Sequence, residues 1–315
     1  MKNIIPHLWF DKEAKEATKF YTSVFPDSNI SNITVLHDTP SGDCDVITFQ
    51  LWKQKFMAIN AGPLFKFNPS VSFIVNFDPL LFGGSLSSEQ AAREKLDKVW
   101  DKLSEGGTAL MPIGEYPFSK RYGWIMDKYG LSWQLILTKP EGEPRPAIVP
   151  SFMFAGSKFG QAEEAINFYL SIFKNSKMGA IHRYEKGQEP YKEGTVMFAD
   201  FMIENTWFAI MDSVGEHKFD FNEAISFIVN CADQNEIDYY WKKLSAFPES
   251  EQCGWLKDKY GMSWQITPAI MEEMMTKGTQ EQIDRLTQAF LPMKKLEIAK
   301  LEEVYQGKRK PKFAG

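Results

Sequence analysis

Gly123-Trp-Ile-Met-Asp-Lys-Tyr-Gly-Leu-Ser-Trp-Gln134 recurs as Gly254-Trp-Leu-Lys-Asp-Lys-Tyr-Gly-Met-Ser-Trp-Gln265. The two stretches are identical at nine of twelve positions, which chance does not explain. An internal repeat determines how the elements of a chain are grouped, so it is considered before any fold is assigned. This pair predicts that the 315 residues contain two tandem copies of one domain.

Shorter matches in the same order extend the repeat. Ala17-Thr-Lys-Phe-Tyr21 matches Ala165-Ile-Asn-Phe-Tyr169, and Trp100-Asp-Lys-Leu103 matches Trp241-Lys-Lys-Leu244. Between the copies, residues 138–146 contain three prolines and a glycine, which is typical of an exposed linker. We therefore predict a first domain at 1–138, a linker at 139–147, a second domain at 148–277, and a C-terminal helical extension and tail at 278–315.

Each copy has the pattern of an α+β domain. Alternating apolar residues bounded by turn residues predict strands, and apolar residues at steps of three and four predict helices. The first copy then begins with a strand, a helix and three strands, at Ile4–Phe10, Lys12–Phe25, Asn29–Leu36, Asp45–Trp52 and Lys55–Asn60. Its second half repeats this order more loosely. The fold class is α+β, built from βαβββ units.

A helical extension follows the second copy. Thr279-Gln-Glu-Gln282 has the pattern of a capping box, in which the first and fourth side chains satisfy backbone amides at a helix start. An apolar stripe at helical spacing comes next: Ile283, Leu286, Phe290, Met293 and Leu296. The stripe packs either on a domain of this chain or on a partner, and both readings stay open.

These elements, with Trp9-Phe-Asp11, Phe65-Lys-Phe-Asn68 and the repeated stretch, resemble the PhnB-like branch of the vicinal oxygen chelate superfamily. That superfamily includes glyoxalase I, extradiol dioxygenases and bleomycin-resistance proteins. The resemblance implies tandem glyoxalase/bleomycin-resistance-like domains, each with two βαβββ units that form a curved mixed sheet around a cleft. Single-copy relatives are expected to pair as dimers, so we predict a pseudo-twofold monomer or a weak homodimer.

Metal-dependent members of the superfamily hold a divalent ion with His, Glu and sometimes Gln side chains. The resemblance places His7 at the first ligand position of the first copy and Gln134 at the last. Residues 70–72 (Ser-Val-Ser) stand where another ligand is needed, and the fourth strand offers only Asn60. A catalytic ion needs at least three good protein ligands. We predict no cofactor; the alternative is one divalent metal in the first domain, with His7 and Gln134 as weak candidates.

The second copy has fewer candidate ligands, because Ser151 replaces the histidine and Asp212 takes the place of Asn60. Its glutamine, Gln265, persists. Each glutamine either contacts a ligand or bonds a neighbouring strand, since a buried amide needs partners. Trp133 and Trp264 are expected in the core. The predicted ligand-binding residues are His7, Trp9, Asn60, Trp124, Gln134, Asp212, Trp255 and Gln265.

Composition narrows the class of partner. The net charge is −5 and the basic cluster at residues 308–312 is terminal, so no nucleic-acid partner is expected. No apolar stretch approaches the roughly 20 residues of a membrane helix, and no signal peptide is predicted. Cys44, Cys231 and Cys253 are sparse and form no CxxC pair, which favours a reducing cytoplasm.

Three functional hypotheses follow. Aromatic residues make up 14% of the chain and can line a pocket, so the first is a small-molecule binding protein without metal. The second is a metal-dependent lyase, isomerase or dioxygenase that uses His7 with Gln134. In the third, one copy has lost its site, as the contrast of His7 with Ser151 suggests. The family's demethylubiquinone methyltransferase label is not supported, since no Gly-rich strand-to-helix turn for a nucleoside cofactor occurs.

Overall fold

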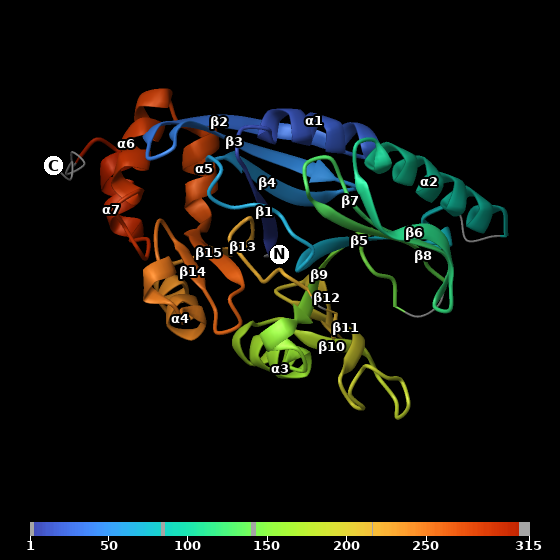
Figure 1. Ribbon diagram of the computed structural model, residues 1–315. Coiled ribbons are helices and arrows are strands. Elements are labelled where there is room, and N and C mark those ends of the chain that lie inside the picture. The colour runs from blue at the N-terminus through green and yellow to red at the C-terminus, as the bar shows by residue number, and fades with distance from the viewer. Residues whose placement is uncertain (1–2, 83–85, 140–142, 216, 309–315) are drawn as a thin grey trace.

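The computed structural model describes residues 3–82, 86–139, 143–215 and 217–308. Part of the predicted linker (140–142) and the basic cluster beyond Lys308 lie outside these ranges. The order of helices and strands confirms the α+β class and the βαβββ units (Figure 1).

The first copy forms two complete units. The first unit consists of β1 (Ile5–Phe10), α1 (Ala14–Val24), β2 (Asn29–Thr39), β3 (Gly42–Leu51) and β4 (Gln54–Asn60). The second consists of β5 (Val71–Phe77), α2 (Leu86–Ser104), β6 (Thr108–Tyr116), β7 (Ser119–Met126) and β8 (Ser132–Leu137).

The second copy departs from this order at its end. Its first unit is complete, with β9 (Ile148–Ala155), α3 (Ala162–Ile172), β10 (Lys177–Arg183), β11 (Val196–Ile203) and β12 (Thr206–Ser213). Its last unit has β13 (Ile225–Cys231), α4 (Gln234–Leu244), β14 (Trp255–Lys257) and β15 (Ser263–Pro268). The C-terminal helices are α5 (Ala269–Lys277), α6 (Gln280–Phe290) and α7 (Ile298–Tyr305).

The two sheets are composites of both copies. Sheet I has the order β14-β15-β13-β1-β4-β3-β2, and sheet II has the order β10-β11-β12-β9-β5-β8-β7-β6. Each copy thus contributes one unit to each sheet. The copies meet in antiparallel pairs, with His7 opposite Ser226 on β1 and β13, and Ser72 opposite Ser151 on β5 and β9. The two units of one copy therefore lie in different sheets, an exchange that the repeat did not reveal.

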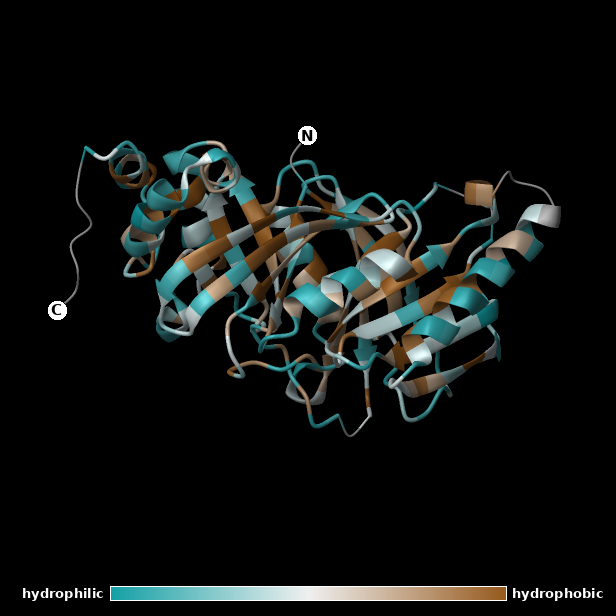
Figure 2. Cartoon of the chain, turned by 90° about the horizontal axis from the view of Figure 1, so that it is seen from above, coloured by the Kyte–Doolittle hydropathy of each residue, from teal (hydrophilic) through white to brown (hydrophobic). Residues whose placement is uncertain are grey.

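Helices α1 to α4 cover the outer faces of the sheets. On α1, Ala14, Ala17, Tyr21 and Val24 are buried at steps of three and four residues, against β2, β3 and β4. Figure 2 shows hydrophobic residues along the strands and hydrophilic ones on the outer turns of the helices. Trp133 is fully buried in this core, as predicted, and so is Trp264.

The repeated stretch also has a structural role, which depends on the aspartate in its turn. Its turn places the Asp127 carboxylate inside the protein, where Oδ2 accepts bonds from the Tyr21 hydroxyl at 2.8 Å and from the Trp133 indole at 2.9 Å. Oδ1 accepts two backbone amides of the turn. In the second copy Asp258 makes the same four bonds with the equivalent groups. In each copy the turn thereby joins a buried tyrosine of the first helix to a buried tryptophan of the last strand.

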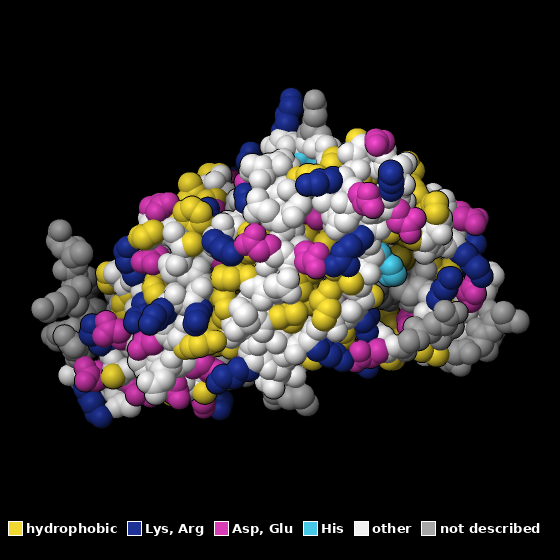
Figure 3. All heavy atoms as spheres, turned by 90° about the horizontal axis from the view of Figure 1, so that it is seen from below, with side chains coloured by type: hydrophobic (Ala, Val, Ile, Leu, Met, Phe, Trp, Pro, Cys, Tyr) yellow, Lys and Arg dark blue, Asp and Glu magenta, His cyan; other side chains and the backbone are white. Residues whose placement is uncertain are grey.

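The C-terminal stripe packs on this chain. Ile283, Leu286 and Phe290 of α6 form a buried cluster with Leu36 and Cys44 of the first copy. Across the face drawn in Figure 3, acidic and basic side chains are intermixed. Within the described ranges, no helix has both the length and the apolar composition that crossing a bilayer requires.

Candidate functional site

A cavity of about 170 Å³ lies between sheet I and the C-terminal helices. Its floor is the inner face of the sheet, opposite the face that α1 covers. Its roof is formed by α5 and α6, which contribute Met271, Met275 and Phe290. The apolar side chains of the floor are Leu36, Val46, Met57, Ile59, Ile228 and Trp255. We call this space the roofed cavity.

His7 is a polar side chain of the floor, and one of its ring nitrogens has no hydrogen-bond partner. It is only 4% exposed, and its Nδ1 is buried without a hydrogen bond. Burial lowers the pKa of this imidazole to about 3, so the ring is neutral at physiological pH. The ring of Trp255 meets it edge-on, with 5.4 Å between centroids. A buried polar atom without a partner is costly, and such a group in a native protein calls for an explanation.

Gln265 lies on β15, which is separated from the strand of His7, β1, by the single strand β13. Its Nε2 donates to the Ser226 hydroxyl at 2.9 Å, and Ser226 is the residue opposite His7 in the sheet. Trp255 is the cross-strand neighbour of Gln265 on β14. The second indole, Trp9, donates to the carbonyl of Gly62 at 2.8 Å and packs against Trp255, with 6.0 Å between ring centroids. It supports the wall without lining the cavity.

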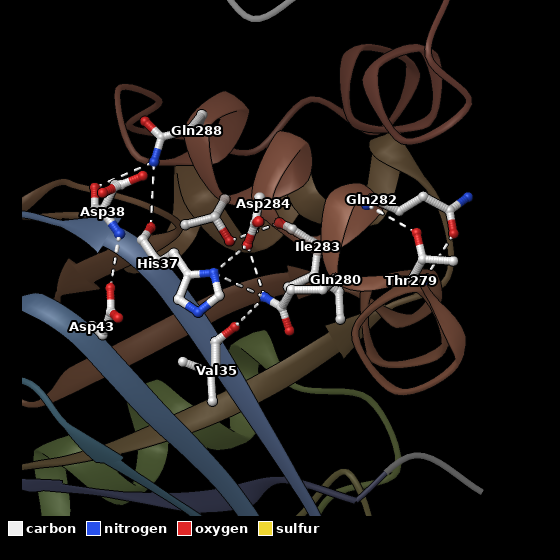
Figure 4. A network of polar contacts seen from close by, with 11 residues as sticks. Val35, His37, Asp38, Asp43, Thr279, Gln280, Gln282, Ile283, Asp284 and Gln288 are labelled. Carbon is white, nitrogen blue, oxygen red and sulfur yellow. Dashed lines mark hydrogen bonds and ion pairs between the residues drawn. The ribbon is translucent and has the colours of Figure 1, made fainter.

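The roof is attached to β2 by polar contacts (Figure 4). Gln280 of α6 donates from Nε2 to the carbonyl of Val35 at 3.0 Å, and His37 Nδ1 lies 3.0 Å from the Asp284 carboxylate. The capping box predicted at the start of α6 is present. Lys55 of β4 forms an ion pair with Glu272 of α5 at the cavity edge. These contacts hold the two roof helices over the inner face of sheet I.

The equivalent face of sheet II is occupied by the protein's own side chains. Ser151 takes the place of His7, and the Gln134 amide donates to Ser72 at 2.7 Å. The Tyr122 hydroxyl donates to Oε1 of Gln134 at 2.8 Å. Trp124 donates to a neighbouring serine hydroxyl on β8.

Arg145 of the linker also covers part of the inner face of sheet II. The Arg145 guanidinium stacks on the ring of Trp207, with 3.7 Å between its central carbon and the ring centroid. It also forms two bonds to the Asp200 carboxylate, at 2.6 and 3.3 Å. Asp200 is 8% exposed, so this ion pair is largely shielded from water.

The structure brings together only some of the predicted ligand-binding residues. His7, Trp9, Trp255 and Gln265 cluster on sheet I, whereas Trp124 and Gln134 lie on sheet II. The hypothesis that His7 acts with Gln134 in one cleft is wrong, because the units of the first copy are exchanged. Gln265, from the second copy, is the glutamine that lies next to His7.

Asn60 and Asp212 face away from both inner faces. Asn60 accepts the backbone amide of Ala14 at 2.7 Å, and Asp212 accepts that of Gly160 at 2.8 Å. Both side chains therefore satisfy backbone amides at or just before the start of a helix, on the outer face. On β4 it is Met57 that lies opposite His7 and lines the cavity.

The residues around His7 do not fit a divalent ion. His7, Met57 and Gln265 line the cavity there, and Ser226 is the residue opposite His7 in the sheet; of these four side chains, only the histidine is a strong ligand. Nowhere in the described ranges do three His, Cys, Asp or Glu side chains gather as a metal site would need. We derive no chemistry through a metal.

The sequence predicted helices after the second copy but left open what they pack on. Met271 and Met275 of α5 are one helical turn apart and both line the cavity, so the roof begins directly after the last strand. Sequence reasoning also did not pair Tyr122 with Gln134, because their contact depends on the register of β7 and β8.

The two composite sheets, built from three βαβββ units and one shorter βαββ unit, define a glyoxalase-type fold. Glyoxalase I from Zea mays superposes with a TM-score of 0.51 at 11% identity, covering 86% of this chain and 95% of that one. A PhnB protein from Bacillus cereus is 37% identical over 42% of this chain and 98% of its own, with a TM-score of 0.36.

The chain belongs to the family described as 3-demethylubiquinone-9 3-methyltransferase, whose model matches residues 2–136 and 146–267. The two segments are one per copy, which confirms the resemblance to PhnB-like proteins in tandem. No functionally curated protein matches the chain.

Proposed function

We propose that this protein binds one small, uncharged molecule per chain, in the roofed cavity. The observation that carries the proposal is His7, a polar side chain whose Nδ1 is buried and unpartnered in an otherwise largely apolar cavity. Ligand sites commonly combine apolar walls with a few polar groups that orient the ligand. A ligand atom that bonds the His7 imidazole from the cavity would give this buried ring a hydrogen-bond partner.

The charges around the cavity favour an uncharged ligand. Among the described lining residues Glu272 is the carboxylate, and it pairs with Lys55. His7 is neutral because its pKa lies near 3. A charged ligand would lose its hydration without gaining a counter-charge, and this costs roughly several kcal/mol in a buried site.

The proposal favours one site over two. On sheet II Ser151, which replaces His7, also has its hydroxyl oxygen buried without a partner. The Gln134 amide on the same sheet is bonded at both ends, however, and Arg145 stacks on that sheet. This arrangement supports the hypothesis that one of the two clefts no longer binds. Methyl transfer, which the family description names, is not part of the proposal, because no glycine-rich turn for a nucleoside cofactor occurs in the sequence.

The test is a thermal-shift screen of uncharged small molecules, followed by calorimetry on the compounds that stabilise the protein. His7→Leu removes the polar nitrogen, and Ser151→Ala is the matched change on sheet II. We expect one molecule per chain, with binding lost in His7→Leu and kept in Ser151→Ala. Two molecules per chain, or binding that His7→Leu leaves unchanged, would contradict the proposal.

A further inference from the structure

The two inner faces allow a direct comparison, because the strands that carry the glutamines are equivalent. On sheet II the Gln134 amide has both ends bonded: Nε2 donates to Ser72, and Oε1 accepts the Tyr122 hydroxyl. Tyr122 is 6% exposed, so its ring fills space on the inner face. A tyrosine side chain thus completes the hydrogen bonding of this glutamine.

On sheet I the same glutamine is half satisfied. Gln265 keeps the bond from Nε2 to Ser226, but the position of Tyr122 is taken by Cys253. The Cys253 thiol donates instead to the carbonyl of Leu291 at 3.1 Å. Among the described residues Oε1 of Gln265 has no donor, and both Gln265 and Cys253 line the roofed cavity. Compared with sheet II, sheet I therefore lacks one aromatic ring and one hydroxyl at this point.

We propose that the ligand of the roofed cavity is a single-ring aromatic alcohol whose hydroxyl donates to Oε1 of Gln265, as Tyr122 does to Gln134. This inference rests on the proposed binding function and names the ligand class. A phenol is uncharged at neutral pH, since its usual pKa is about 10, which matches the lack of an unpaired charge in the cavity.

The size and the walls of the cavity agree with one ring. An apolar protein cavity of about 150 Å³ accommodates benzene, and the roofed cavity measures about 170 Å³. Trp255 and Phe290 present aromatic surfaces, and the thioethers of Met271 and Met275 make favourable contacts with aromatic rings. The imidazole of His7 lines the same cavity and offers a hydrogen bond to a second polar substituent.

The experiment compares p-cresol, which is the tyrosine side chain as a free molecule, with toluene, which lacks only the hydroxyl. Calorimetry on the full chain should show one p-cresol per chain, bound about tenfold more tightly than toluene, as one additional hydrogen bond predicts. Gln265→Leu should abolish this preference. Gln265→Glu, which keeps an acceptor oxygen, should retain it, and so should the sheet II control Tyr122→Phe.

The outcomes separate this inference from the proposed function. Equal binding of toluene and p-cresol, with loss of both in His7→Leu, would overturn the inference and leave the binding function standing. A p-cresol preference that survives Gln265→Leu in a folded variant would also overturn it. If neither probe binds while another uncharged compound binds through His7, the aromatic-alcohol class is wrong. If no compound binds through His7, both proposals fail.

Discussion

Replacing His7 by leucine should remove a specific part of the pH dependence of stability. In the folded protein burial holds the pKa of His7 at about 3, whereas an unfolded chain exposes a histidine with the usual pKa near 6.5. Below pH 6.5 His7 therefore binds a proton in the unfolded state but not in the folded state. The contribution of His7 to the free energy of unfolding is thus fully present above this pH and is lost as the pH falls toward 3.

The magnitude follows from the linkage relation. Each pH unit between the two pKa values contributes about 1.4 kcal/mol. Between pH 7 and pH 5 the His7 contribution is thus a loss of about 2 kcal/mol of stability. Every other titrating group is shared by the two proteins, so the difference between their pH profiles isolates this histidine.

The assay is urea unfolding at several pH values from 7 to 5, on the wild type, on His7→Leu and on a control. The control is His182→Gln, which removes a histidine from the exposed face of β10. His7→Leu should lose about 2 kcal/mol less than the wild type over this range, and His182→Gln should follow the wild type. Parallel profiles for the wild type and His7→Leu would refute the assignment of His7 as a buried, neutral imidazole.

Three further changes test contacts outside the roofed cavity. Tyr122→Phe removes the donor to Gln134 and should lower the free energy of unfolding by about 1 kcal/mol in urea titrations; an unchanged midpoint would mean that the bond contributes nothing. Asp258→Ala leaves two side-chain donors and two backbone amides buried without an acceptor, so calorimetry should show a loss of at least about 3 kcal/mol. Arg145→Ala leaves the Asp200 carboxylate largely buried without its guanidinium partner, so the free energy of unfolding should fall by about 2 kcal/mol. The linker should also be cleaved faster by proteases; a cleavage rate equal to that of the wild type would mean that Arg145 does not hold the linker on sheet II.

The exchange of units explains why the site could be read only in part from the sequence. His7 and Gln265 were both identified as candidates, yet they belong to different copies, 258 positions apart in numbering. Strand periodicity shows which residues share a face, but it does not show which two strand edges meet. In the structure β9 pairs with β5 and β1 pairs with β13, so both junctions between the copies depend on contacts between distant segments.

Asn60 and Asp212 show a second limit. They occur at polar positions near the ends of strands where a ligand was sought, but each points to the outer face and bonds a backbone amide near a helix start. A shift of one residue along a strand reverses the face of a side chain. Only the register of β4 against β1 shows that Met57 and not Asn60 faces the cavity.

The sequence by itself determined the two copies, the βαβββ order, the family resemblance and the capping box of the extension, because these depend on local periodicity and on a repeat visible in the chain. The tertiary structure alone decided the exchange of units between sheets, the roof of α5 and α6 over sheet I, and the difference between the two glutamines. These features arise from contacts between segments far apart in the chain, where strand edges, apolar faces and hydrogen-bond partners must match in space.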